Sequence, residues 1–112
     1  MKKLFIPLVV EIFKVLSYLP LMSSFGKGMY SSCLFGIASG FYYGKKYKEA
    51  ISAYDKALNY SVGMENEPPL NIAFENAYVS LGKMYENGLG TNKDEIKAEE
   101  YYLRAGSREL ND

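Results

Sequence analysis

The apolar positions of the chain predict a protein built from helices. They recur every three or four residues over most of its length, and glycine, proline and lysine clusters separate the runs. The runs indicate five helices: one near the N-terminus and two helical hairpins, over residues 29–60 and 71–106. A 112-residue chain is long enough for a single domain with its own core. We therefore expect an all-α single domain over residues 1–112.

The segment from Ala77 to Ala105 has the sharpest pattern. Its first half places Gly82 on the apolar face, so a second helix can pack close there. Gly88 and Gly90 follow, and glycine accepts the left-handed conformation that ends a helix. Asp94 is expected early in the second helix, where a carboxylate suits the positive end of the helix dipole. These features predict one helical hairpin.

The residue types of this hairpin resemble a Sel1-like repeat, a relative of the tetratricopeptide repeat. The matching positions are Ala77, Leu81, Gly82, Tyr85, Gly88, Gly90, Asp94, Lys97, Ala98, Tyr101, Tyr102 and Ala105. Thr91 and Gly106 depart from the family pattern, which usually has a small aliphatic residue and a second alanine there. The resemblance implies a scaffold that binds other proteins.

A weaker version of the pattern occupies residues 29–60, where Ala38 takes the place of Gly82, 44 residues earlier. Gly44 and the lysines after it predict a turn, and the run YKEAISAYDKALNY predicts a returning helix. This part resembles a tetratricopeptide repeat at Leu34, Ile37, Ala38, Phe41, Ala50, Tyr54 and Ala57. The two resemblances together imply a short right-handed helical-repeat solenoid. An unrelated helical hairpin is the alternative for residues 29–60.

Residues 1–28 predict an amphipathic helix followed by a connection at Ser23 to Lys27. Pro7 suits a first turn and Pro20 helps to end the helix. The polar side carries Glu11, Lys14 and Tyr18. The apolar stripe consists of Leu8, Val9, Ile12, Val15, Leu16 and Leu19. We expect this stripe to cover the exposed end of the first hairpin.

The first residues also resemble a secretion signal, because two lysines precede an apolar run. Glu11 and Lys14 interrupt that run and favour a retained, packed helix in a cytoplasmic protein. A cleaved signal, and hence an exported protein, is the alternative, and a peripheral membrane helix is a third. Membrane contact is not expected.

Two polar segments complete the chain. Residues 61–70 contain Gly63 and the pair Pro68 and Pro69, which predict an exposed loop between the hairpins. Residues 107–112 predict a short polar tail.

Charge is balanced overall but unevenly placed. Residues 1–59 carry eight lysines and three acids, a net of +5, whereas residues 60–112 carry ten acids and five bases, a net of −5. The acidic half would attract a basic partner. Ordinary solvated helix faces are the alternative explanation.

Candidate chemistry is sparse. Histidine is absent and Cys33 is the single cysteine, which excludes a structural zinc site, a histidine-based triad and an internal disulfide. Gly88 and Gly90 lack the further glycine and the strand that a phosphate-binding loop requires. Lysines 45, 46 and 48 lie among aromatic residues, but the acidic half disfavours nucleic acid. We expect no enzyme activity, cofactor or small-molecule substrate.

The resemblance implies that the first helix of each hairpin lines a concave surface. The candidate protein-binding residues are Ser32, Phe35, Ser39, Tyr42, Tyr43, Asn76, Val79, Lys83, Glu86 and Asn87. Tyrosine offers a large contact area with a polar tip, which suits recognition. For Tyr42 and Tyr43, partner contact and core packing are both open.

The expected function is a non-enzymatic protein-binding module. One specific version is a small cognate inhibitor, or immunity protein, that neutralises a bacterial toxin such as a nuclease by occlusion. The alternative is an adaptor or chaperone-like Sel1 or tetratricopeptide repeat protein in envelope or secretion biology.

Overall fold

A computed structural model describes residues 2–16 and 23–110, with side chains described within 7–15 and 26–106. These residues form five helices and contain no strand, so the predicted all-α class is confirmed for the described chain. The helices are α1 (Lys2–Leu16), α2 (Ser23–Tyr43), α3 (Tyr47–Tyr60), α4 (Leu70–Asn87) and α5 (Glu95–Leu110).

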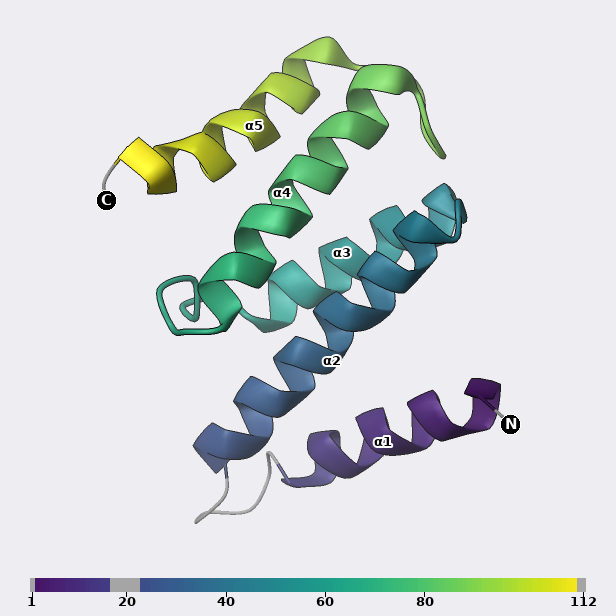
Figure 1. Ribbon diagram of the computed structural model, residues 1–112, viewed down its shortest axis with the longest axis vertical. Coiled ribbons are helices and arrows are strands. Elements are labelled where there is room, and N and C mark those ends of the chain that lie inside the picture. Colours follow the sequence, from purple (N-terminus) through teal and green to yellow (C-terminus); the bar gives the residue numbers. More distant parts are fainter. Residues whose placement is uncertain (1, 17–22, 111–112) are drawn as a thin grey trace.

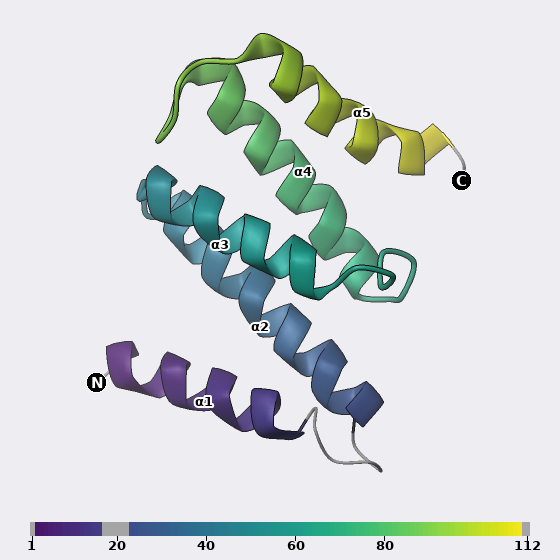
Figure 2. The same ribbon diagram turned by 180° about the vertical axis from the view of Figure 1, so that it is seen from behind.

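The helices follow one another along the long axis of a flat molecule. α1 lies at one end and α5 at the other, with α2, α3 and α4 between them (Figures 1 and 2). α3 lies behind α2 in Figure 1 and in front of it in Figure 2. The Cα atoms span 43 × 38 × 16 Å, and the shortest dimension fits two layers of helices about 10 Å apart. α2 packs on α3, α4 on α5, and α1 on α2.

The core consists of small residues where helices cross and aromatic rings between them. Ala38, Ala50 and Ala57 are fully buried between α2 and α3, as their spacing predicts. The rings of Phe35 and Phe74 have centroids 5.1 Å apart and join the two hairpins. Because alanine carries no side chain beyond Cβ, helices can approach closely while the rings fill the remaining space.

The predicted turn of the second hairpin is confirmed. Gly88 has φ +66° and caps α4 in the left-handed conformation, and Gly90 has φ +73°. Asp94 lies just before α5 rather than in it, and its Oδ1 accepts a hydrogen bond of 3.0 Å from the Lys97 backbone N–H. In the turn of the first hairpin, Lys45 and not Gly44 has the positive φ, at 63°.

Gly82 has the packing role that its position predicts. A Cβ added there would lie 2.6 Å from Cε1 of Tyr102, so the tyrosine ring of α5 occupies the space that a side chain would need. The hydroxyl of the same ring donates a 3.0 Å hydrogen bond to Oε1 of Glu86. Tyr102 therefore joins α5 to α4 at two points.

The N-terminal helix differs from its prediction. α1 begins at Lys2, so Pro7 lies inside it and not in its first turn. The predicted apolar stripe is divided: Leu8, Ile12 and Val15 are more than half exposed. The residues that pack against the core are Val10 and Phe13 instead. Because α1 is apolar on both sides, its pattern alone does not determine which side faces α2.

Two predicted boundaries are wrong. Residues 23–27 are the first turn and a half of α2 and not a connection, although Gly26 and Gly28 are poor helix formers. Gly26 is buried, which indicates that packing outweighs the low helix propensity of glycine. Residues 107–110 continue α5, so the predicted tail is helical up to that point. The expectations for Tyr18, Leu19 and Pro20 lie outside the described residues.

None of the described helices combines the length and the apolar character that crossing a membrane requires.

Candidate functional site

The predicted binding residues of α4 lie mostly at the surface. Asn76, Lys83, Glu86 and Asn87 are exposed, and Val79 is half-buried. Two of them are held by contacts within the molecule. Asn87 Nδ2 donates to the Lys83 carbonyl oxygen at 3.0 Å, and Glu86 accepts from Tyr102. Whether they contact a partner stays a prediction.

Two predicted residues of α2 point into the molecule. Phe35 is only 4% exposed and packs against Phe74, so it belongs to the core and is not available to a partner. Ser39 is half-buried, and its Oγ lies 3.2 Å from the hydroxyl oxygen of the buried Tyr54. The helical pattern places both on the correct helix, but on the side that α3 and α4 cover.

Tyr42 and Tyr43 are neighbours in sequence with different environments. Tyr43 is 79% exposed, whereas Tyr42 is half-buried and packs against the core. The Tyr42 ring meets Tyr43 edge-on at 5.2 Å and Tyr47 of α3 edge-on at 5.9 Å. We call these three residues the tyrosine cluster. Edge-to-face contacts at this distance are favourable, so the exposed Tyr43 ring is held by the Tyr42 ring.

Two tyrosines of this region, Tyr42 and Tyr102, have a raised pKa. Burial raises the pKa of Tyr42, and the nearby Tyr47 and Tyr43 add to this effect. Burial also raises the pKa of Tyr102 to about 12, with further contributions from Glu86 and Tyr42.

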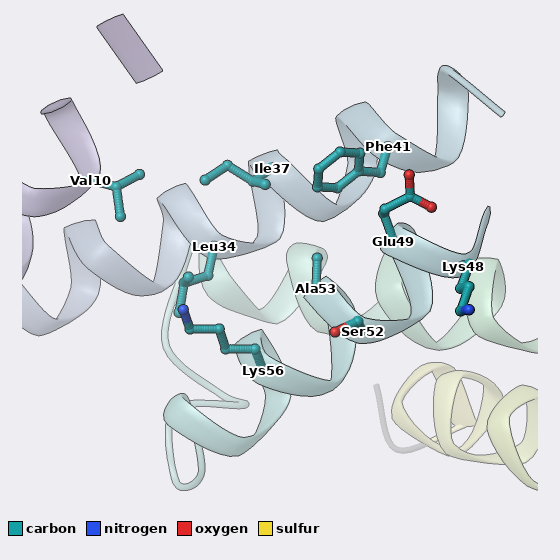
Figure 3. A pocket seen from close by; sticks show the side chains of 9 residues that line it. All are labelled: Val10, Leu34, Ile37, Phe41, Lys48, Glu49, Ser52, Ala53 and Lys56. Carbon is teal, nitrogen blue, oxygen red and sulfur yellow. The ribbon is translucent and has the colours of Figure 1, made fainter. Parts of the chain in front are cut away.

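A second surface is a trough along the C-terminal half of α2, lined also by α1 and, in its smaller part, by α3. It consists of two cavities of about 540 and 690 Å³ that share Val10, Ile37 and Phe41. Figure 3 shows the smaller one, with side chains from α1, α2 and α3 around it. The whole trough is lined mainly by apolar groups, and sequence reasoning did not find it.

Part of the floor of the larger cavity is glycine backbone. Gly36 and Gly40 of α2 line it, and a Cβ added to either would meet no atom within 4 Å. Charged residues lie around the two cavities: Lys46, Lys48, Lys56 and Glu49. The trough is thus an apolar groove with a mainly basic rim.

A row of stacked rings stabilises the contact between α4 and α5. Tyr101 stacks on Tyr85 and on Tyr78, with ring centroids 5.8 and 6.3 Å away. Lys97 Nζ lies 4.7 Å from the Tyr85 centroid, and Arg104 Cζ lies 5.6 Å from that of Tyr101. The stacked rings and these cation–π contacts show that Tyr78, Tyr85 and Tyr101 pack α5 against α4.

Two further features concern metal-ligating groups and the single cysteine. Among the side chains of residues 7–15 and 26–106, no three potential metal ligands come together. Burial raises the pKa of the Cys33 thiol, which keeps it protonated and a poor nucleophile. The tyrosine cluster and the trough both offer apolar contact area beside polar or charged groups.

Comparison with protein-family models, curated proteins and solved structures finds no match. The resemblance of residues 77–105 to a Sel1-like repeat therefore stays a prediction.

Proposed function

We propose that this chain is a non-enzymatic protein-binding module whose helices form a short right-handed solenoid. Its two hairpins pack in order, α2 with α3 and α4 with α5. Tyr54 and Tyr102 support an internal repeat, because the hydroxyl of each reaches the preceding helix, at Ser39 and Glu86. The Sel1-like residue pattern adds to this support.

The tyrosine cluster is the observation that carries the proposal. A ring that is 79% exposed yet held edge-on by a neighbour is ordered before a partner arrives. Such a side chain loses little conformational entropy on binding, and tyrosines are frequent among the residues that contribute most to interfaces. Tyr42 and Tyr47 act as its support.

The specific version is a cognate inhibitor that covers the active site or substrate-binding face of a toxin. Residues 60–112 carry ten acids and five bases, which suits a basic toxin such as a nuclease. Glu86, which is exposed and accepts a hydrogen bond from Tyr102, would be part of that contact. An adaptor that binds several proteins is the second candidate, which the exposed residues of α4 also permit.

The test is affinity capture from the native host with the full chain, compared with Tyr43→Ala. We expect one dominant partner at 1:1 stoichiometry, and binding weakened on the order of 30-fold by the loss of one anchoring tyrosine. Val62→Ala is the matched control, because Val62 is a similarly exposed apolar residue in the loop after α3.

The outcomes separate the candidates. Strong binding of one protein that weakens steeply with salt supports the inhibitor, and weak binding of several proteins supports the adaptor. Equal recovery by wild type and Tyr43→Ala would contradict the role of the tyrosine cluster.

A further inference from the structure

We propose that the trough on α2 binds the outward face of α5 from a second copy of this chain. This inference concerns a different surface from the tyrosine cluster and does not depend on the function proposed above. It rests on three properties: the shape of the trough, the exposed face of α5, and the opposite charges of the two.

The trough has the dimensions and lining of a helix-binding groove. Gly36, Gly40 and Gly44 line it, so the floor extends over about 12 Å of helix axis at the usual rise per residue. The bare backbone at Gly36 and Gly40 allows a second helix to approach closely. Ile37 and Phe41 beside them supply apolar contact, as in grooves that bind amphipathic helices.

α5 presents a matching helix face to solvent. Ile96 and Leu103 are 76% and 63% exposed. They are separated by two helical turns and lie about 10.5 Å apart along the axis, which fits the length of the floor. Glu99 and Glu100 lie between them on the same side of the helix, and both are exposed. The face is therefore apolar with acidic flanks.

The charges of the two surfaces are complementary. Lys46, Lys48 and Lys56 surround the trough, and Glu49 is the one acid among its lining residues. They belong to the half of the chain with net charge +5, whereas α5 belongs to the half with net charge −5. A docked α5 would place Glu99 and Glu100 near these lysines, which favours association and fixes its direction.

The α5 that occupies the trough must come from another molecule. α1, which forms one wall of the trough, and α5 lie at opposite ends of the long axis (Figure 1). Each copy thus offers one trough and one α5, and the contact joins two different surfaces. Two copies can form a closed pair in which each α5 lies in the trough of the other copy. Alternatively, further copies can add through the same contact and form an open chain.

The first experiment is sedimentation velocity of the full chain from micromolar to millimolar concentration, at low and high salt. We expect species larger than the monomer that increase with concentration, and association weakened on the order of tenfold at high salt. Gly40→Leu fills the floor of the trough and should leave the chain monomeric. Gly28→Leu is the matched control, because Gly28 also faces open space on α2 but does not line the trough.

A mixing experiment then identifies the two surfaces. Leu103→Asp places a charge on the α5 face and should also give a monomer, whereas Ile72→Asp alters an exposed residue of α4 and should not. Gly40→Leu retains its α5, and Leu103→Asp retains its trough. A mixture of these two monomeric variants should form a 1:1 heterodimer through one intact contact.

Three results would overturn the inference: a wild-type chain that is monomeric at millimolar concentration and low salt, association that survives Gly40→Leu, or monomeric variants that do not combine. A monomeric wild-type chain would mean that the trough does not bind α5 of a second copy. Tyr43→Ala should not change self-association, so failure here and failure of the proposed function are distinguishable.

Discussion

At the scale of single residues, Gly82 of α4 leaves space for the Tyr102 ring of α5 to pack closely. The Tyr102 ring lies where a Cβ of residue 82 would be, and its hydroxyl reaches Glu86 one turn further along α4. An alanine at position 82 would displace the ring and its hydrogen bond together. The same substitution at Gly36 meets no atom within 4 Å.

We predict that Gly82→Ala destabilises the protein by about 1–3 kcal/mol, because overpacking outweighs the better helix propensity of alanine. Gly36→Ala should instead stabilise by about 0.5–1 kcal/mol, since only the propensity changes. Urea unfolding monitored by circular dichroism measures both.

The double variant Gly82→Ala/Tyr102→Ala tests whether contact with the Tyr102 ring is the cause of the destabilisation. Once the ring is absent, Gly82→Ala should no longer destabilise, and the coupling energy between the two sites should be large. If Gly82→Ala costs the same with and without the ring, Tyr102 is not the reason that glycine is needed there.

At the scale of elements, α1 has two apolar sides with different roles. Val10 and Phe13 pack against the core, while Leu8, Ile12 and Val15 face outward. α1 contacts α2 and forms one wall of the trough through Val10. Its contribution to stability therefore depends on the inner side alone.

We predict that Phe13→Ala lowers the free energy of unfolding by about 1–3 kcal/mol, because it removes part of a large ring from a packed contact. Ile12→Ala, its neighbour on the exposed side, should cost about 0.5 kcal/mol or less. Chemical unfolding of the two variants measures the difference. Equal effects would mean that α1 does not pack on α2 by this side.

At the scale of the whole molecule, the tyrosines make stability depend on pH. Burial raises the pKa of Tyr42, Tyr101 and Tyr102, the last to about 12. The neighbouring Tyr85 raises the pKa of Lys97. The folded state therefore holds these protons more strongly than the unfolded state, in which tyrosine has a pKa of about 10. The part of the stability that these groups contribute is fully present below about pH 10 and is lost as the pH rises towards 12.

We predict that the urea midpoint of the wild type falls between pH 9 and about pH 11.5, because the unfolded chain loses its tyrosine protons first. Tyr102→Phe removes the group with the largest shift, so its midpoint should fall less over the same range. Unfolding curves at several pH values measure this, with Tyr43→Phe as the control because Tyr43 is exposed. Parallel curves for wild type and Tyr102→Phe would contradict the assignment.

The sequence by itself determined the helices and the turn that depend on local chemistry. The repeat of small and large residues predicted α3 over the run that it occupies, and Gly88 and Gly90 predicted the end of α4. These features need only the preference of each residue and its near neighbours, so a linear pattern is sufficient.

Only the tertiary structure decided which sides of the helices are covered. Phe35 became core because α4 brings Phe74 to it, and Tyr43 stayed exposed although Tyr42 beside it did not. The trough required α1 and α3 to pack beside α2, so the sequence gives no local sign of it. Burial at each of these sites is set by a helix distant in the sequence, and one-dimensional periodicity does not specify that partner.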